Sequence, residues 1–124
     1  MSDLWPTELR VSKDRQRLLV TFNDGASFDL SAEMLRVLSP SAEVQGHGPG
    51  QKLTVPGKRN VAIIAMTPTG NYAVRIGFDD FHDTGIYTWS YLRELGEKGA
   101  DLFADYEREL AEKGMSRDIS EKPR

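Results

Sequence analysis

The chain has 124 residues, a formal net charge of −3, 39% hydrophobic and 28% charged residues, and no cysteine. This length supports one hydrophobic core, and the missing cysteines exclude disulfides, thiolate nucleophiles and cysteine zinc sites within the chain. The acidic balance argues against nucleic acid as a partner, and no apolar run approaches the roughly 18 residues of a membrane span.

The N-terminus, Met-Ser-Asp-Leu-Trp-Pro, shows no secretory pattern, so we expect a cytoplasmic protein. We also expect residues 1–114 to form a single domain and residues 115–124 to form a polar, flexible tail.

The first third of the chain predicts a three-stranded antiparallel meander. Apolar and polar residues alternate in three runs within residues 7–30. The runs are separated by turn residues at 13–16 and at 23–26, and the second group tolerates the positive φ of tight hairpins. Ser31 is a good N-cap for a helix of about two turns, which Pro40 ends.

The middle of the chain predicts a loop and a second hairpin. Residues 39–58 are rich in glycine and proline, so we expect an irregular loop, mobile over 46–58 in the free protein, with residues 53–55 as a candidate edge strand. The apolar run 61–66 is typical of a central strand buried on both faces. A turn at 67–71 then leads into a strand over 72–78.

Two helices are expected in the last third. Thr88 or Ser90 begins the first, Gly96 or Gly99 ends it, and the second covers about residues 100–113. The alternating aromatic residues before the first helix leave open a short strand there. The sequence therefore predicts an α+β fold, mainly an antiparallel sheet built from hairpins, with two or three helices packed against it.

One polar turn gathers the acid–base and metal-capable side chains, namely Asp79, Asp80, His82 and Asp83. These side chains satisfy backbone groups of the turn in one interpretation. In the other they contact a metal ion or a small ligand. The sequence leaves both open.

Other chemistry has little support. His47 lies among glycines that can expose backbone N–H groups to an anion, but the spacing does not match a phosphate-binding loop. No Gly-x-Ser-x-Gly elbow is present, and the two histidines lack the carboxylate spacing of a non-haem iron site. We therefore expect no catalytic residues, no cofactor and no enzymatic activity.

Aromatic residues are dense between Phe81 and Tyr91 and include Tyr87 and Trp89. They can form an exposed binding surface or pack a helix onto the sheet. The alternation of Tyr87, Trp89 and Tyr91 favours core packing for part of this run.

Three segments together resemble the gamma-butyrobetaine hydroxylase-like N-terminal domain family over roughly residues 7–96. They are Phe-Asp-Leu at 28–30 with Leu35 and Arg36, Gly-Asn-Tyr-Ala at 70–73, and Asp-Phe-His-Asp-Thr-Gly-Ile-Tyr-Thr-Trp at 80–89. In the eukaryotic carnitine-biosynthesis dioxygenases, this domain precedes the catalytic barrel. There it binds zinc through Leu-Arg-x-x-Cys-Pro-Cys-x-x-Cys and a histidine in an Asp-x-His turn.

The resemblance implies that this zinc site has been lost. It places Ser39, Ser41 and Val44 at the three cysteine positions, keeps Pro40, and puts His82 on the histidine. Hydroxyls and valine cannot replace thiolates in a tetrahedral zinc site. Packing must then supply the stability that zinc would have given.

Similar domains are joined to Mrp-type ATPases that carry iron–sulfur clusters, so the resemblance implies an interaction or accessory module. An iron–sulfur carrier ATPase or an oxygenase would be its partner. The alternative is a small-ligand or metal-binding domain that uses the turn at 79–83 to assist a separate enzyme. The expected interaction surface comprises His47, Lys52, Lys58, Arg59, Phe81, His82 and Tyr87.

Overall fold

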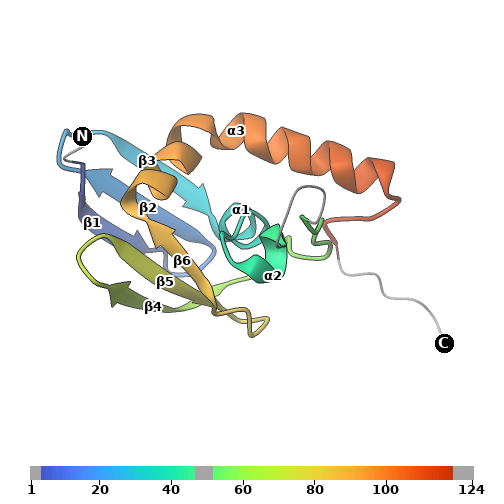
Figure 1. The fold of residues 1–124 in the computed structure, drawn as a ribbon, viewed down its shortest axis with the longest axis horizontal. Helices are drawn as coiled ribbons and strands as arrows, with labels where there is room; N and C mark the ends of the chain where they lie inside the picture. The colour runs from blue at the N-terminus through green and yellow to red at the C-terminus, as the bar shows by residue number, and fades with distance from the viewer. Residues whose placement is uncertain (1–3, 47–51, 119–124) are drawn as a thin grey trace.

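The N-terminal meander is confirmed in the computed structural model, which describes residues 4–46 and 52–118. Strands β1 (Pro6–Val11), β2 (Arg17–Phe22) and β3 (Ser27–Ser31) form an antiparallel sheet in that order (Figure 1). The alternating residues Leu18, Val20 and Phe22 of β2 are buried in the core. The alternation of side chains along β2 thus decides which face of the first sheet packs against the core.

A second antiparallel sheet contains β4 (Ile63–Thr69), β5 (Ala73–Phe78) and β6 (Gly85–Thr88), with β5 in the middle. The prediction of a central strand over 61–66 is wrong, because β4 is an edge strand and Ile64 is 53% exposed. The register shifts between Ile63 and Ala65, which marks a β-bulge or irregularity in this edge strand. Pro68 within β4 agrees with an edge position.

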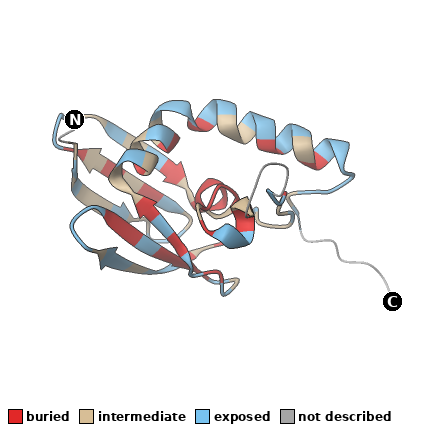
Figure 2. Cartoon of the chain, viewed as in Figure 1, coloured by how far each residue is buried: buried red, intermediate tan, exposed pale blue. Residues whose placement is uncertain are grey.

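The short strand that the sequence allowed before the last helix is present as β6. The two antiparallel sheets and three helices confirm the α+β fold. Helix α1 (Ala32–Val37) begins as expected, because the Ser31 hydroxyl accepts a hydrogen bond from the Met34 N–H at 3.0 Å. This helix is buried on almost every side (Figure 2).

The segment expected to be an irregular loop contains a short helix, α2 (Ala42–Gln45), with Ser41 as its N-cap. The Glu43 N–H donates to the Ser41 hydroxyl at 3.1 Å. Residues 53–55 do not form a strand; the Leu53 N–H donates to the Val44 carbonyl at 2.7 Å. His47 lies outside the described residues.

The two helices expected in the last third are one continuous helix, α3 (Trp89–Glu112), of 24 residues. The prediction that it ends at Gly96 or Gly99 is wrong. A Cβ at Gly96 would lie 2.5 Å from Cγ of Phe28, and one at Gly99 would lie 2.9 Å from Sδ of Met34. Both glycines let the helix backbone approach β3 and α1 closely. Figure 1 shows the C-terminal half of α3 extending beyond both sheets.

Residues 115–118 turn back onto the loop before β4, a contact that the expected flexible tail did not anticipate. The Gly57 and Arg59 N–H groups donate to the carbonyls of Ser116 and Arg117 at 2.9 and 3.0 Å. Arg117 also donates two hydrogen bonds of 2.7 Å to the buried Glu33 of α1. Within residues 4–46 and 52–118, no helix is both long and apolar enough to cross a membrane.

Candidate functional site

The polar turn lies between β5 and β6, and its side chains have separate partners. Asp79 Oδ1 accepts a hydrogen bond from the Ala62 N–H at 3.1 Å. The Cβ of Asp83 lies against Gly77 of β5, at 3.4 Å from where a glycine Cβ would stand. Among the described residues no group of three or more His, Cys, Asp or Glu side chains could hold a metal ion. The sequence suggested that four such groups could reach one point, whereas the described residues do not gather three of them into a metal site.

Asp80 fixes the turn to α1 and to the loop before β4. Its Oδ2 accepts from Arg36 Nε at 2.7 Å and from Lys58 Nζ at 2.6 Å. Its Oδ1 accepts from the His82 N–H at 3.1 Å. Burial by itself raises the pKa of Asp80, but the hydrogen bonds from Lys58 and Arg36 outweigh burial and hold the pKa below its usual value. The carboxylate is therefore charged at neutral pH.

His82 sits in a hydrogen-bonded chain between Ser39 and Glu43. Its Nδ1 lies 2.9 Å from Glu43 Oε1, and its Nε2 lies 2.9 Å from Ser39 Oγ. With Nδ1–H donating to the carboxylate, the neutral ring accepts the Ser39 hydroxyl hydrogen at Nε2. Burial, followed by the nearby Arg36, lowers the pKa of His82, although Glu43 acts in the opposite direction.

The order hydroxyl, imidazole, carboxylate is that of an activated nucleophile. A nucleophile must reach its substrate, however, and Ser39 is 0% exposed while His82 is 4% exposed. The Ser39 oxygen also accepts the Ser41 N–H at 3.2 Å. The chain of hydrogen bonds therefore joins the segment between α1 and α2 to the polar turn, and its hydroxyl and imidazole groups do not reach the surface.

Phe81 is the exposed member of the turn. Its N–H donates to the Phe78 carbonyl at 3.0 Å, and the Phe78 N–H donates to the His82 carbonyl at 2.9 Å, which closes a loop over residues 79–81. Phe81 has φ of 71° and its side chain lies almost wholly in solvent, since the residue is 90% exposed. The left-handed position of such a loop ordinarily holds glycine.

Two residues of the expected interaction surface are buried. Tyr87 is 0% exposed and its hydroxyl donates to the Leu35 carbonyl, and burial raises its pKa. Together with His82 it is therefore excluded from an exposed contact surface. Tyr91 is partly buried, and burial raises its pKa to about 12. Part of the aromatic run thus packs the core, as the alternation favoured.

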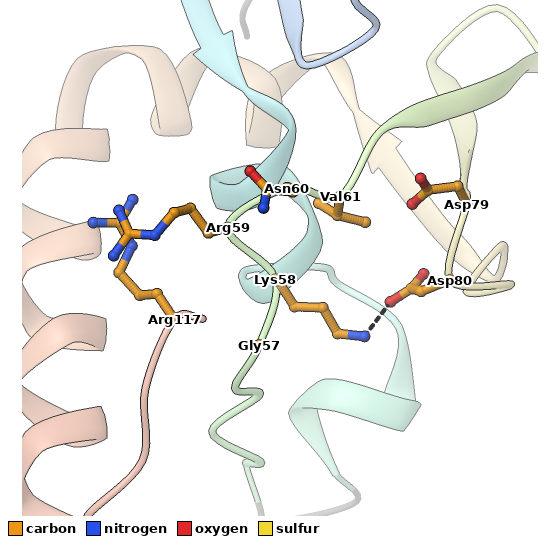
Figure 3. A pocket seen from close by; sticks show the side chains of 8 residues that line it. All are labelled: Gly57, Lys58, Arg59, Asn60, Val61, Asp79, Asp80 and Arg117. Carbon is orange, nitrogen blue, oxygen red and sulfur yellow. Dashed lines mark ion pairs between the residues drawn. The ribbon is translucent and has the colours of Figure 1, made fainter. Parts of the chain in front are cut away.

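The basic residues of the expected surface differ in setting. Lys52 is exposed, Lys58 pairs with Asp80, and Arg59 pairs with Asp118 at 2.5 Å. The last two border a cavity of about 270 Å³ (Figure 3). Its polar lining comes from Lys58, Arg59, Asn60, Asp79, Asp80 and Arg117.

Sequence reasoning missed the roles of Arg36 and Arg117. Arg36 lies in one of the resembling segments, which is its only signal in the sequence. Arg117 falls within the expected flexible tail.

A family model described as gamma-butyrobetaine hydroxylase-like, N-terminal, matches residues 9–93. The chain belongs to this family. A comparison with curated proteins found no match. Two NMR solution structures are similar to this family member with TM-scores of 0.80. One has 45% identity over 94% of this chain and 92% of the other, and the second has 43% identity over 100% and 96%.

A crystal structure from Acidithiobacillus ferrooxidans ATCC 23270 is also similar. It has a TM-score of 0.61 and 37% identity, and the match covers 73% of this chain and 91% of that one. That protein is described as having unknown function and as belonging to the DUF971 family.

In this gamma-butyrobetaine hydroxylase-like N-terminal domain, hydrogen bonds and apolar packing occupy the positions that the resemblance assigns to zinc ligands. Ser39 contacts His82, and the Ser41 hydroxyl lies 2.7 Å from that of Thr84. Val44, at the third cysteine position, is buried. Hydroxyls and an aliphatic side chain do not fit a structural zinc ion, so no role is assigned to that metal.

Proposed function

We propose that this domain is a non-enzymatic, cytoplasmic protein-interaction module whose contact surface is centred on Phe81. One observation carries the proposal: an aromatic ring that is 90% exposed stands on a residue with φ of 71°. A non-glycine residue in the left-handed region is destabilising by about 1–2 kcal/mol. Such strain persists where the surroundings enforce it, and it clusters at functional sites.

The turn behind Phe81 is held rigidly, which supports the same role. Asp80 is fixed by Arg36 and Lys58, and His82 is fixed by Ser39. A ring presented on a pre-organised loop loses little conformational freedom when it enters a partner's pocket. Exposed aromatic side chains of this kind often contribute a large share of the binding energy at interfaces.

The rim of this surface is polar. Asp79 and Asp83 are exposed on either side of Phe81 in the chain, and Lys58 and Arg59 border the adjacent cavity.

The family resemblance supports an iron–sulfur carrier ATPase or an oxygenase as the partner. The alternative function is a domain that binds a small ligand and assists a separate enzyme. The cavity beside Asp79 and Asp80 favours a small ligand over a metal ion in that alternative.

Affinity purification from the native cell tests the proposal. The tagged chain is compared with Phe81→Ala and with Tyr72→Ala, which removes an exposed aromatic ring in the β4–β5 turn. We expect a defined partner protein with the parent chain and with Tyr72→Ala, and its loss with Phe81→Ala. Equal recovery with both variants would exclude Phe81 as the contact.

A further inference from the structure

We propose that the cavity bordered by Lys58, Arg59 and Asn60 binds the phosphoryl group of a small molecule. The inference rests on the small-ligand alternative above, and it does not depend on the Phe81 contact, whose polar rim this cavity adjoins. The inference rests on the convergence of basic side chains from distant segments at one cavity, where one carboxylate is shared between two cations.

The backbone builds the cavity wall. The Val61 N–H donates to the Lys58 carbonyl at 3.1 Å, so residues 58–61 form a turn. Hydrogen bonds from the Gly57 and Arg59 N–H groups then hold this turn against residues 116 and 117. In Figure 3 the Lys58 side chain reaches toward Asp80, whereas Arg59 extends on the side of Arg117. The turn thus presents cationic groups on two sides of the cavity.

Two cationic side chains beside the cavity share one carboxylate oxygen. Lys58 and Arg36 both use Oδ2 of Asp80, and their side chains are only 21% and 12% exposed. A lysine ammonium can donate several hydrogen bonds, yet within residues 4–46 and 52–118 Lys58 pairs with the carboxylate of Asp80 alone. In the described part of the chain, Arg36 Nη1 is the buried side-chain polar atom without a hydrogen-bond partner. The residues that line the cavity include three cationic side chains, Lys58, Arg59 and Arg117, and two carboxylates, Asp79 and Asp80, so an anion next to Lys58 would offset the remaining positive charge.

The carboxylates that would compete with an anion for these cations are engaged elsewhere or are only weakly bound. Asp79 lines the cavity and is engaged by the Ala62 N–H. Arg59 pairs with Asp118, whose side chain is 61% exposed. Because exposed ion pairs contribute little, an external oxyanion can replace Asp118 at small energetic cost. Arg117 stays paired with Glu33 and lines the cavity without binding the anion.

The shape of the site indicates the ligand class. The volume of about 270 Å³ lies just below the range of about 300–1,000 Å³ that is typical of drug-sized ligands, which suits a small ligand. Donors on opposite sides suit an acceptor with several oxygens in different directions, as a phosphoryl group has, better than a planar carboxylate.

The test is an NMR titration of the full chain with inorganic phosphate at neutral pH and constant ionic strength. We expect saturable shifts at the amides of residues 57–61 and 79–80. Asn60→Asp places a negative charge on the cavity wall without changing side-chain size, and it should weaken binding by about fivefold or more. Asn71→Asp makes the same change in the β4–β5 turn and should leave binding unchanged.

A second pair of variants removes a positive charge instead of adding a negative one. Lys58→Gln should weaken phosphate binding, whereas Lys52→Gln, which changes an exposed lysine with the same loss of charge, should not. Absence of saturable shifts, equal effects of Asn60→Asp and Asn71→Asp, or equal effects of the two lysine variants would overturn the site. Acetate binding as tightly as phosphate would overturn the phosphoryl assignment. Recovery of a partner through Phe81 is measured separately, so either proposal can fail alone.

Discussion

Replacement of Phe81 by glycine should stabilise the free domain. The left-handed backbone at φ of 71° costs a non-glycine residue about 1–2 kcal/mol. Glycine removes that strain but loses about 0.4–1 kcal/mol through the greater entropy of the unfolded chain. Little burial is lost, because Phe81 is 90% exposed. The expected net gain is about 0.5–1 kcal/mol, or about 2–4 °C in melting temperature for a domain of this size.

Thermal and denaturant unfolding of the parent chain, Phe81→Gly and Phe81→Ala measure this effect. Alanine removes the ring and keeps the strain, so it should differ from the parent by less than about 0.5 kcal/mol. Arg15, with φ of 63°, is the matched control. Arg15→Gly should stabilise the domain without reducing partner recovery, whereas Phe81→Gly should stabilise it and abolish recovery. If Phe81→Gly is no more stable than Phe81→Ala, the inference of strain is refuted.

Three further predictions concern the interior. Because burial and Arg36 lower the pKa of His82 from 6.5, the unfolded chain binds that proton more tightly, so the free energy of unfolding should fall as pH drops below about 6.5. Urea midpoints of the parent and of His82→Gln check this, and an unchanged slope in the variant would contradict it. Gly96→Ala should lower stability by about 1–3 kcal/mol through the clash with Phe28, despite alanine's higher helix propensity, and a higher melting temperature would argue against that packing. Chelator should leave the melting temperature unchanged, and stoichiometric zinc together with a chelator-induced fall would exclude folding without metal.

The predictable parts of the fold were those governed by local patterns. The alternation of apolar and polar residues predicted the three strands of the first sheet. The capping preference of serine predicted Ser31 at the start of α1. The errors came from contacts between distant segments. Gly96 suggests a helix end when only its neighbours are considered, yet it lies within α3 because the ring of Phe28 packs there.

The candidate site was predicted only in part for the same reason. The polar turn could be located from sequence, but His82 and Phe81 face opposite environments, and no local pattern distinguishes them. The buried His82 ring contacts Ser39, which is 43 positions away in the chain. Exposure of Phe81 follows from the loop that Phe78 and His82 close. Long-range packing of this kind cannot be derived from spacing alone.

Site-specific photocrosslinking tests the interaction role most directly. A photoreactive phenylalanine analogue at position 81 would report which molecule touches that ring in the native cell, and the same analogue in place of the exposed Tyr72 is the control. We predict a discrete protein adduct from position 81 and none from position 72. No adduct from position 81, or the same adducts from both positions, would contradict the assignment of Phe81 as the centre of a specific contact.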